Sequence, residues 1–313
     1  MYLSKKTVRL LDERLQELSS LRPISPSVMQ KTQERFEVEM TYNSNAIEGN
    51  SLSLKETYWV IQEGLTIKEK PLKDHLEARN QKEALDFLYQ LVDERKRIAI
   101  NENLIKLLHN LVIYDSDREI AGKYRKGEVA ISGSNHIPVR AYKIKPEMAK
   151  LIIWLQQNKK SHHVVELAAL LHYKFVSIHP FWDGNGRTAR LIMNVLLMKA
   201  GYPLSIILKT DRKKYYRVLE RADSGDPKPL CEFIARSVIR SLNIYLSSVQ
   251  TSQNSRNRFI SLESLSKQTK YSAAYLKKLA GLGKLEAYKE NRNWLSTEKA
   301  LQDYIQNRER KRG

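Results

Sequence analysis

Cysteine and long apolar runs are nearly absent from this sequence. Its 313 residues contain one cysteine, Cys231, which excludes an intrachain disulfide and a zinc site built from cysteines. No apolar run approaches the roughly 18 residues that a membrane-spanning helix needs. The start, MYLSKKTVRLLDERL, is charged and lacks the apolar centre of a signal peptide. We therefore expect a soluble, cytoplasmic protein without a membrane partner, and the single cysteine fits a reducing compartment.

Acidic residues are also in deficit. Asp and Glu number 35 against 54 Lys and Arg, which gives a net charge of +19. This charge favours anionic partners such as nucleotides or nucleic acid, although it carries no information about the fold. From residue 251 onward, 14 Lys and Arg stand against 6 Asp and Glu. The length suits about two domains.

Helical periodicity dominates up to residue 246. Apolar residues recur at helical spacing in DHLEARNQKEALDFLYQLVDERK, NENLIKLLHNLVIY and KPEMAKLIIWLQQNKK. The exception is YRKGEVAISGSNHIPVRAYKI, where two β-compatible runs flank Gly133-Ser134-Asn135. The sequence therefore predicts a mainly α fold with one short β-hairpin in this part of the chain.

The C-terminal part of the sequence predicts a separate small domain. Residues 247–258, SSVQTSQNSRNR, are polar and lack periodicity, which predicts a linker. Two helices, a hairpin turning at Asn291-Arg292 and a closing helix are expected after it. The predicted organisation is an N-terminal helical region over 1–100, a core over 101–246, the linker, and a small domain over 259–313.

The stretch SNAIEGN, Ser44 to Asn50, breaks a rule of helix ends. Ser25 followed by Pro26 predicts the start of a helix, and Gly49 predicts its end. Glu48 then faces the negative end of the helix dipole, which costs about 0.3 to 1 kcal/mol unless a cation compensates. The position therefore predicts a positive partner for Glu48. The alternative is an ordinary solvated surface acid.

Residues 178–191, IHPFWDGNGRTARL, concentrate polar groups between two apolar helical segments. Gly184, Asn185 and Gly186 allow the backbone N–H groups to converge, and the helix that begins near Arg187 directs its positive end to the same point. Arg187 and Arg190 are three residues apart, so both guanidinium groups can reach successive phosphates. The pattern predicts an anion site.

Two further side chains in this stretch suit phosphate chemistry. Asp183 offers the hard oxygen that Mg²⁺ takes when phosphates fill most of its coordination shell. His179, at the end of the preceding helix, is placed to act as a base near neutral pH. Each feature alone has an ordinary alternative: a structural histidine, a simple turn, or solvated arginines. Their combination favours the functional interpretation.

The segment HPFWDGNGRTAR resembles the Fic family signature, His-x-Phe-x-Asp/Glu-Gly-Asn-Gly-Arg-x-x-Arg, at every defined position. The likeness runs from about Thr41 to Arg240. It implies a Fic-type helical core with a hairpin flap, and transfer of AMP from ATP to a Ser, Thr or Tyr hydroxyl of a target protein, with pyrophosphate released. The implied cofactors are ATP and Mg²⁺. Auto-modification and a homodimer are also compatible with the resemblance.

The resemblance implies roles residue by residue. His179 would be the base that deprotonates the target hydroxyl, and Asp183 the Mg²⁺ ligand. The residues that would hold the nucleotide are Gly184, Asn185, Gly186, Arg187, Arg190 and Tyr216. A flap that pairs with an extended target segment would contain Ile131, Ser132, Gly133, Ser134 and His136, by strand addition. The alternative for the flap is an ordinary surface hairpin.

SNAIEG also resembles the family's inhibitory helix motif, Ser/Thr-x-x-x-Glu-Gly/Asn. This makes Ser44 and Glu48 inhibitory residues, with Arg190 as the expected cation and the γ-phosphate obstructed. One departure concerns the nucleobase: many relatives carry Asn where Asp223 stands. An ionised acid accepts but does not donate hydrogen bonds, so selectivity for adenine is less secure.

The C-terminal domain resembles small winged helix-turn-helix-like DNA-binding domains. Ser272 to Leu282 is the candidate recognition helix, and the candidate phosphate contacts are Lys277, Lys278, Lys284, Lys289 and Arg292. The alternative is a structural or dimerising accessory domain. Three functions are therefore weighed: a self-inhibited protein adenylyltransferase, a DNA-binding regulator whose Fic-like core senses nucleotide, and an enzyme that uses Glu48 to remove AMP from modified targets.

Overall fold

The computed structural model describes residues 2–22, 24, 26–93, 99–131, 136–256, 260–290 and 293–310. The chain divides into two compact units, Met1–Tyr245 and Leu246–Gly313. Among the described helices, none combines the length and the apolar character needed to cross a membrane.

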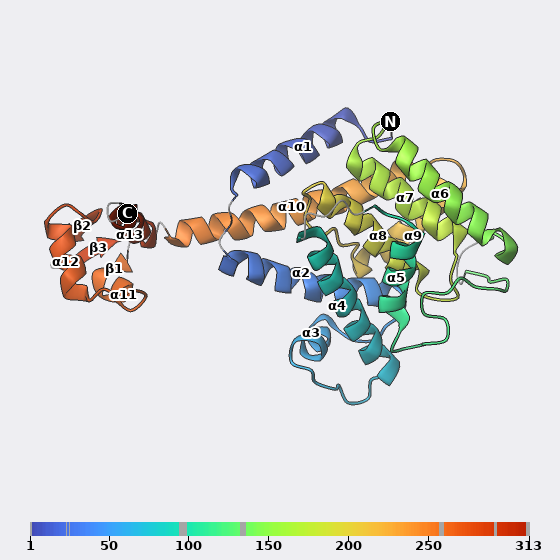
Figure 1. The fold of residues 1–313 in the computed structure, drawn as a ribbon, viewed down its shortest axis with the longest axis horizontal. Helices are drawn as coiled ribbons and strands as arrows, with labels where there is room; N and C mark the ends of the chain where they lie inside the picture. Colours follow the sequence, from blue (N-terminus) through green and yellow to red (C-terminus); the bar gives the residue numbers. More distant parts are fainter. Residues whose placement is uncertain are drawn as a thin grey trace. The chain divides into compact units, whose positions relative to one another are not determined.

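Unit Met1–Tyr245 is helical, as predicted (Figure 1). Short 3₁₀ turns at Ala141–Lys143 and Lys209–Asp211 precede α6 and α9. The helices are α1 Lys5–Ser20, α2 Pro26–Ile47, α3 Leu54–Gln62, α4 Leu72–Asp93, α5 Glu102–Ile113, α6 Ile144–Asn158, α7 Val164–Ile178, α8 Asn185–Lys199, α9 Arg212–Asp223 and α10 Lys228–Arg256, the last of which continues into the second unit.

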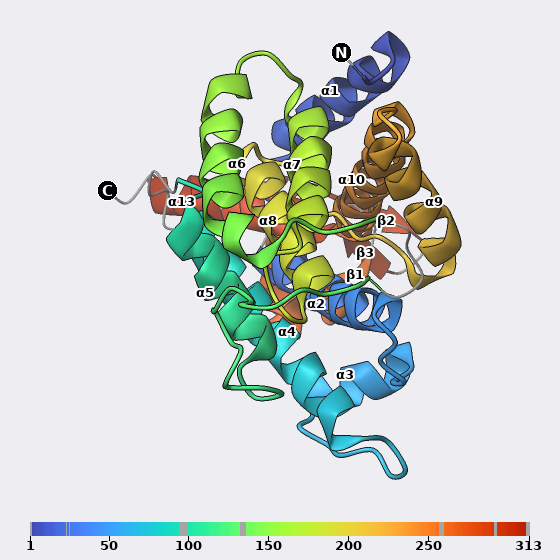
Figure 2. The same cartoon turned by 90° about the vertical axis from the view of Figure 1, so that its right-hand side faces the viewer.

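Helix α8 is the centre around which this unit packs. It makes its most extensive contact with α7, and α2, α4 and α5 also pack against it (Figure 2). Apolar residues occur all around the helix, and Leu191, Met193 and Val195 are fully buried. A helix that is apolar on every side belongs in a core. Its N-terminus is therefore held in one place by four neighbouring helices.

The predicted β-hairpin is not confirmed in the described residues. Residues 124–131 and 136–140 are not in strand conformation, and the predicted turn, Gly133-Ser134-Asn135, lies outside the described residues. The carbonyls of Gly127 and Val139 accept hydrogen bonds from the side chain of Arg125 instead of from a facing strand. Residues 124–131 and 136–140 are called the two arms of the flap segment below.

The predicted end of the long helix near residue 246 is wrong, because α10 continues without interruption to Arg256, through most of the predicted linker over 247–258. The stretch contains neither Pro nor Gly. Extending an existing helix avoids the cost of nucleation, and each Ser, Thr, Asn or Gln adds no more than about 0.7 kcal/mol relative to Ala. Low hydrophobicity was therefore a poor signal for the end of this helix.

Unit Leu246–Gly313 contains the predicted helices and hairpin strands, together with a short strand, β1, that was not predicted. They are β1 Ile260–Ser261, α11 Leu262–Ser266, α12 Ala273–Gly281, β2 Ala287–Glu290, β3 Asn293–Ser296 and α13 Glu298–Arg310. The sheet order is β1-β3-β2, and both pairings are antiparallel. The predicted turn at Asn291-Arg292 lies outside the described residues, but the strands on either side of it pair. That the C-terminal unit is a winged helix-turn-helix-like domain stays a prediction.

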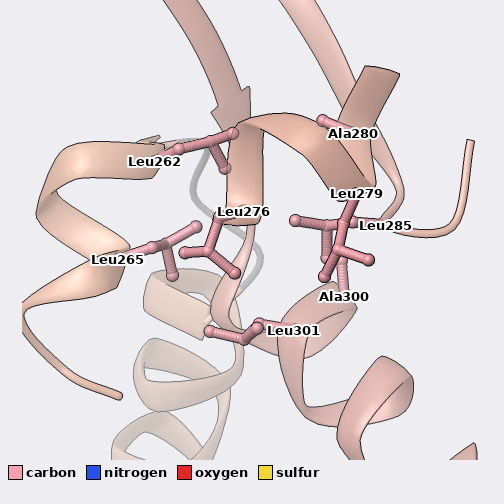
Figure 3. Packing of buried hydrophobic residues seen from close by; sticks show 8 residues of the cluster. All are labelled: Leu262, Leu265, Leu276, Leu279, Ala280, Leu285, Ala300 and Leu301. Carbon is pink, nitrogen blue, oxygen red and sulfur yellow. The ribbon is translucent and has the colours of Figure 1, made fainter. Parts of the chain in front are cut away.

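A leucine-rich core holds this second unit together (Figure 3). Leu262 and Leu265 come from α11, Leu276 and Leu279 from α12, and Leu301 from α13. Leu276 is fully buried among them. The C-terminal unit is therefore compact around an apolar core of its own.

Replacing Leu276 by alanine should destabilise the C-terminal unit by about 2 to 5 kcal/mol, because the change removes buried methyl groups and leaves a cavity. Amide hydrogen exchange of peptides from 262–301 would measure the loss as faster exchange. Leu282→Ala is the matched control: that side chain is 58% exposed at the end of α12, so we expect a change within about 0.5 kcal/mol. Equal effects of both changes would contradict the assigned core.

Candidate active site

A cavity of about 460 Å³ brings together nine of the site residues predicted from the sequence. It is lined by the end of α7, the start of α8, one face of α9 and the residue that follows α2. The predicted residues in its lining are Glu48, Ile131, His136, His179, Asp183, Gly184, Asn185, Gly186 and Tyr216, and Asp223 also lines it. Arg187 and Arg190 are 1% exposed and lie in the first turns of α8.

Residues of the loop between α7 and α8 fix the conformation of that loop. Gly184 has φ +73°, and a Cβ there would lie 2.8 Å from Ile113 Cδ1, so both the backbone and the available space require glycine. The amide of Asn185 donates to the Phe181 carbonyl at 2.9 Å and accepts from the Phe181 N–H at 3.0 Å. The side chain of Asn185 therefore shapes the loop and leaves only its backbone N–H for an anion.

The start of α8 has the features of an anion site. Its first intrahelical bond runs from Thr188 N–H to Gly184 O at 2.9 Å. The N–H groups of Asn185, Gly186 and Arg187 precede that bond, so they belong to the helix end whose donors have no helical acceptor. Together with the positive end of the dipole, they favour a bound anion.

His109, on α5, holds the loop between α7 and α8 in place. Sequence reasoning missed this role, because the only signal is a histidine in an apolar helix. Its ring stacks on Phe181 with 3.6 Å between centroids. Nδ1 accepts from Gly122 N–H at 2.9 Å, so Nε2 carries the proton and donates to Asp183 O, also at 2.9 Å. Burial lowers the pKa of His109 to about 4, which keeps this tautomer neutral.

Asp183 is half-exposed and ionised. Burial alone would raise the pKa of its carboxyl, but Arg187, the Gly184 N–H and Lys73 together lower it below its ordinary value. Its oxygens lie 3.4 Å from Arg187 Nη2 and 3.8 Å from Lys73 Nζ. An exposed, ionised carboxylate beside an anion site fits a divalent cation that also binds phosphate. In the described residues, no cluster of three or more His, Cys, Asp or Glu side chains offers a metal site made of protein alone.

Arg187 is positioned by α4, which the sequence reasoning did not identify. Its Nη1 lies 3.2 Å from Glu77 Oε1, and Glu77 is itself buried. Glu77 Oε2 accepts from the Asn50 amide at 3.0 Å. A buried guanidinium needs such partners, because an unpaired charge in the interior is costly.

The predicted cationic partner of Glu48 is confirmed as Arg190. Arg190 Nη2 lies 2.7 Å from Glu48 Oε1. The same guanidinium donates from Nε to Ser44 Oγ at 2.9 Å and from Nη2 to Ser44 O at 2.8 Å. Gly49 has φ +106° just after the end of α2, as predicted. The acid that disturbs the end of α2 is therefore compensated from α8.

The carboxylate of Glu48 lies directly against the start of α8. A Cβ on Gly186 would overlap Glu48 Oε1 and would lie 3.1 Å from Glu48 Cδ and 3.2 Å from Arg190 Nη1. Arg190 Nη1 is buried without a hydrogen-bond partner in the described part of the chain. Glu48 therefore occupies an anion position of this helix end, with one donor of Arg190 left unused.

Tyr215 and His172 form a buried pair next to Arg190. The sequence did not predict this role for either residue. The Tyr215 hydroxyl lies 2.9 Å from His172 Nε2, and both side chains are buried. Burial, followed by the charge of Arg190, lowers the pKa of His172 to about 3. The neutral ring therefore accepts from Tyr215, whose oxygen in turn interacts with Arg190.

His179 ends α7 in the left-handed region, at φ +52° and ψ +59°. Burial lowers the pKa of its imidazole to about 4, and Arg125 and His136 act in the same direction. A hydrogen bond to the backbone of Val176 and the charge of Glu48 oppose this shift. At neutral pH the ring is therefore uncharged and able to accept a proton.

The part of the cavity next to α9 contains His136 and Asp223. His136 Nδ1 lies 3.1 Å from Asp223 Oδ1, and its Nε2 lies 2.8 Å from the carbonyl of Ser177. Tyr216 lines the same cavity beneath the guanidinium of Arg212, whose Cζ is 5.0 Å from the ring centroid.

Several predicted residues fall outside this cavity. Ser132, Gly133 and Ser134 of the flap lie outside the described residues, as does Arg292. Lys277 and Lys278 are exposed on α12 in the C-terminal unit.

Residues 99–197 match the Fic/DOC family. The chain is 34% identical over 247 residues to a protein adenylyltransferase Fic from Nematostella vectensis, covering 79% of this chain and 57% of that protein. It is 34% identical over 245 residues to the Drosophila virilis protein of the same name, covering 78% and 50%. The chain thus spans about half the length of these relatives.

Solved structures show the same helical arrangement. A Fic domain containing signalling protein from Bacteroides thetaiotaomicron superposes with a TM-score of 0.72 at 27% identity, covering 77% of this chain and 97% of that one. A fragment of Fic-1 from C. elegans gives a TM-score of 0.70 at 28% identity, covering 79% and 73%.

We expect the His179 ring to titrate near pH 4 rather than near its ordinary value of about 6.5. Because its folded pKa is depressed, the neutral base is present above about pH 4 and is lost as the pH falls through that value. The free energy of unfolding should accordingly decrease from about pH 6.5 down to about 4, since the unfolded chain binds the proton first. NMR titration would measure the pKa, with His179→Gln assigning the resonance. A midpoint near 6.5 would contradict the burial argument.

Proposed function

The chain belongs to the Fic/DOC family, and from its site we propose that it is a self-inhibited protein adenylyltransferase. It would transfer AMP from ATP to a hydroxyl side chain of a target protein. The observation that carries this proposal is the position of Glu48, whose carboxylate pairs with Arg190 at 2.7 Å and covers Gly186 at the start of α8. A carboxylate in an anion site is an internal competitor for a phosphate group.

The donors of α8 fit a triphosphate. The N–H groups at the start of the helix would hold the α- and β-phosphates, together with Arg187. Arg190 would bind the γ-phosphate, and its buried, unpartnered Nη1 is a donor suited to that role. Glu48 already uses Nη2 of the same guanidinium, so the inhibitory carboxylate and the γ-phosphate would compete for one side chain.

Asp183 is the residue that would hold Mg²⁺, because its carboxylate is ionised, half-exposed and adjacent to the phosphate donors. A divalent cation bound there supplies charge neutralisation on the phosphate oxygens. Binding would replace the present contacts of Asp183 with Lys73 and Arg187.

His179 would act as the base. Its neutral imidazole would take the proton of the target hydroxyl as that oxygen forms a bond to the α-phosphorus. The bond from the α-phosphorus to the oxygen that bridges it to the β-phosphorus would break in line, and its electron pair would leave with pyrophosphate. The imidazolium would then lose its proton to water. The protein contributes mainly position and charge stabilisation.

Target recognition would involve the flap segment. Ile131 and His136, the described members of the predicted flap set, both line the cavity. An extended segment of a target protein would lie along the arms and bring a Ser, Thr or Tyr hydroxyl to His179. The acceptor can also come from a second copy of this chain, which would appear as auto-modification.

Replacing Glu48 by glycine should increase AMP transfer at least tenfold, because it removes a charged competitor worth about 1.5 to 3 kcal/mol. Incubation with α-labelled ATP and cell extract measures the label on the protein or a partner. His179→Ala in the same background should remove the signal.

Two outcomes would change this proposal. A folded Glu48→Gly variant that transfers nothing from any nucleotide would rule it out. If the unaltered protein released AMP from a labelled partner and Glu48→Gln did not, Glu48 would serve to align water for removal of AMP instead.

We propose, as a second function, that the C-terminal unit binds the DNA backbone. Four lysines on or after α12 are exposed, namely Lys277, Lys278, Lys284 and Lys289. They accompany two short helices and an antiparallel ladder, and the region is strongly basic. In this function the Fic core would regulate, or be regulated by, binding to DNA.

The double change Lys277→Glu, Lys278→Glu should weaken DNA binding and reduce its salt dependence, because two phosphate contacts are lost. A mobility-shift titration at two salt concentrations measures both effects. Lys299→Glu, an exposed site on α13, is the control outside the predicted helix, and it is compared with Lys277→Glu alone so that both changes reverse one charge. Absence of salt-sensitive binding by the unaltered chain would leave this unit as an accessory domain.

A further inference from the structure

The side chain of Arg125 is fully buried, yet within the described residues none of its hydrogen bonds goes to a carboxylate. Its Nε donates to the carbonyl of His179 at 2.8 Å, its Nη1 to Gly127 O at 2.7 Å, and its Nη2 to Val139 O. Its backbone N–H donates to Pro180 O at 3.0 Å. One residue thus ties together the first arm of the flap segment, the second arm, and the loop that follows α7.

The geometry requires a guanidinium. The three acceptors are carbonyls of separate segments that lie in three directions around the side chain. A planar fork with five N–H groups can satisfy them together, whereas a lysine ammonium on a flexible stem cannot hold the same three directions. The nearest carboxylate, Glu128, lies 3.9 Å away and is 66% exposed, so the charge of Arg125 is only partly balanced.

His179 depends on external support. A residue other than glycine at positive φ costs about 1 to 3 kcal/mol unless its surroundings impose that conformation. The N–H of His179 donates to Phe175 O at 3.1 Å, and its carbonyl accepts from Arg125. Arg125 therefore holds one of the two backbone groups that define the direction of the His179 ring.

We propose that Arg125 is a positioning residue that couples the two arms of the flap segment to the orientation of His179. When a target segment lies along the arms, Arg125 keeps the carbonyls of both arms at fixed positions relative to the His179 carbonyl. The acceptor hydroxyl of the target therefore lies at a fixed position relative to the His179 ring. This proposal rests on the proposed transfer reaction. None of the hydrogen bonds of Arg125 goes to Glu48, Asp183 or the start of α8, so it acts on the transfer step rather than on binding of ATP.

The pKa of His179 offers a second measurement of the effect of Arg125, because several charged or titratable groups face the His179 ring. Besides Arg125 they are Glu48 at the end of α2 and His136 on the second arm. Arg125 favours the neutral ring through its positive charge. Removing the charge should raise the pKa of His179, whereas a lysine that keeps the charge should leave it nearly unchanged.

The experiment compares Arg125→Lys and Arg125→Gln in the active Glu48→Gly background. We expect both to lower kcat for AMP transfer at least tenfold, while the Kd for ATP, measured by calorimetry, stays within twofold. NMR titration of His179 should show a raised pKa in Arg125→Gln only. Glu128→Gln is the matched control: it removes the neighbouring charge and retains an oxygen for the Ala141 N–H, so kcat should stay within twofold.

Two outcomes would overturn the proposal: an Arg125→Lys variant with kcat within twofold of its parent, or a loss of ATP affinity as large as the loss of kcat. Circular dichroism checks that each variant folds. If Arg125→Gln unfolds, Arg125→Lys still decides, because amide exchange in residues 124–131 and 136–140 should accelerate without a change at α8. If the parent transfers nothing from any nucleotide, the proposed function fails, but amide exchange and the His179 titration still test the coupling.

Discussion

The ion pair between Glu48 and Arg190 is the contact on which the arrangement of this site depends. It joins the end of α2 to the first turns of α8 across 142 residues of sequence. Arg190 is almost completely buried, and a guanidinium in that environment is stable only with acceptors on most of its donors. Ser44 and Glu48 provide three of them, so α2 cannot leave α8 without exposing or orphaning this charge.

The other charged groups of the site follow the same rule. Arg187 is paired with Glu77 from α4, and Glu77 is in turn bound by Asn50. Arg125 is satisfied by carbonyls, which fix the loop after α7 and the two arms of the flap segment. The pairing of Arg187 brings α4 to the start of α8, and the hydrogen bonds of Arg125 hold the loop that precedes α8. The start of α8 is therefore held by partners from several parts of the chain. In the function proposed above, a phosphate would replace one of these partners, Glu48.

Burial has a second consequence, because it keeps three histidines in and around the site neutral. His109 and His179 have pKa values near 4, and His172 near 3. His109 and His172 use their neutral tautomers to hold the loop and Tyr215, whereas His179 faces the cavity. Burial thus produces two structural histidines, His109 and His172, and one candidate base, His179. The difference between them is that only His179 lines the cavity.

Local rules in the sequence were sufficient for several conclusions. Helical periodicity predicted the helical core, Gly49 marked the end of α2, and the Gly184-Asn185-Gly186 turn before Arg187 predicted the anion site at the start of a helix. An acid at a helix C-terminus predicted a cation for Glu48, and the family signature identified Arg190 as the candidate. These are short-range signals, set by backbone conformation and by the helix dipole.

Tertiary structure alone decided that Arg125 replaces strand pairing in the flap segment and that α10 continues through residue 256. It also decided that His109 positions the loop between α7 and α8 and that Glu77 positions Arg187. These contacts join residues far apart in sequence, and their partners are chosen by packing and by the cost of leaving a buried charge or donor unpaired, which no local pattern encodes.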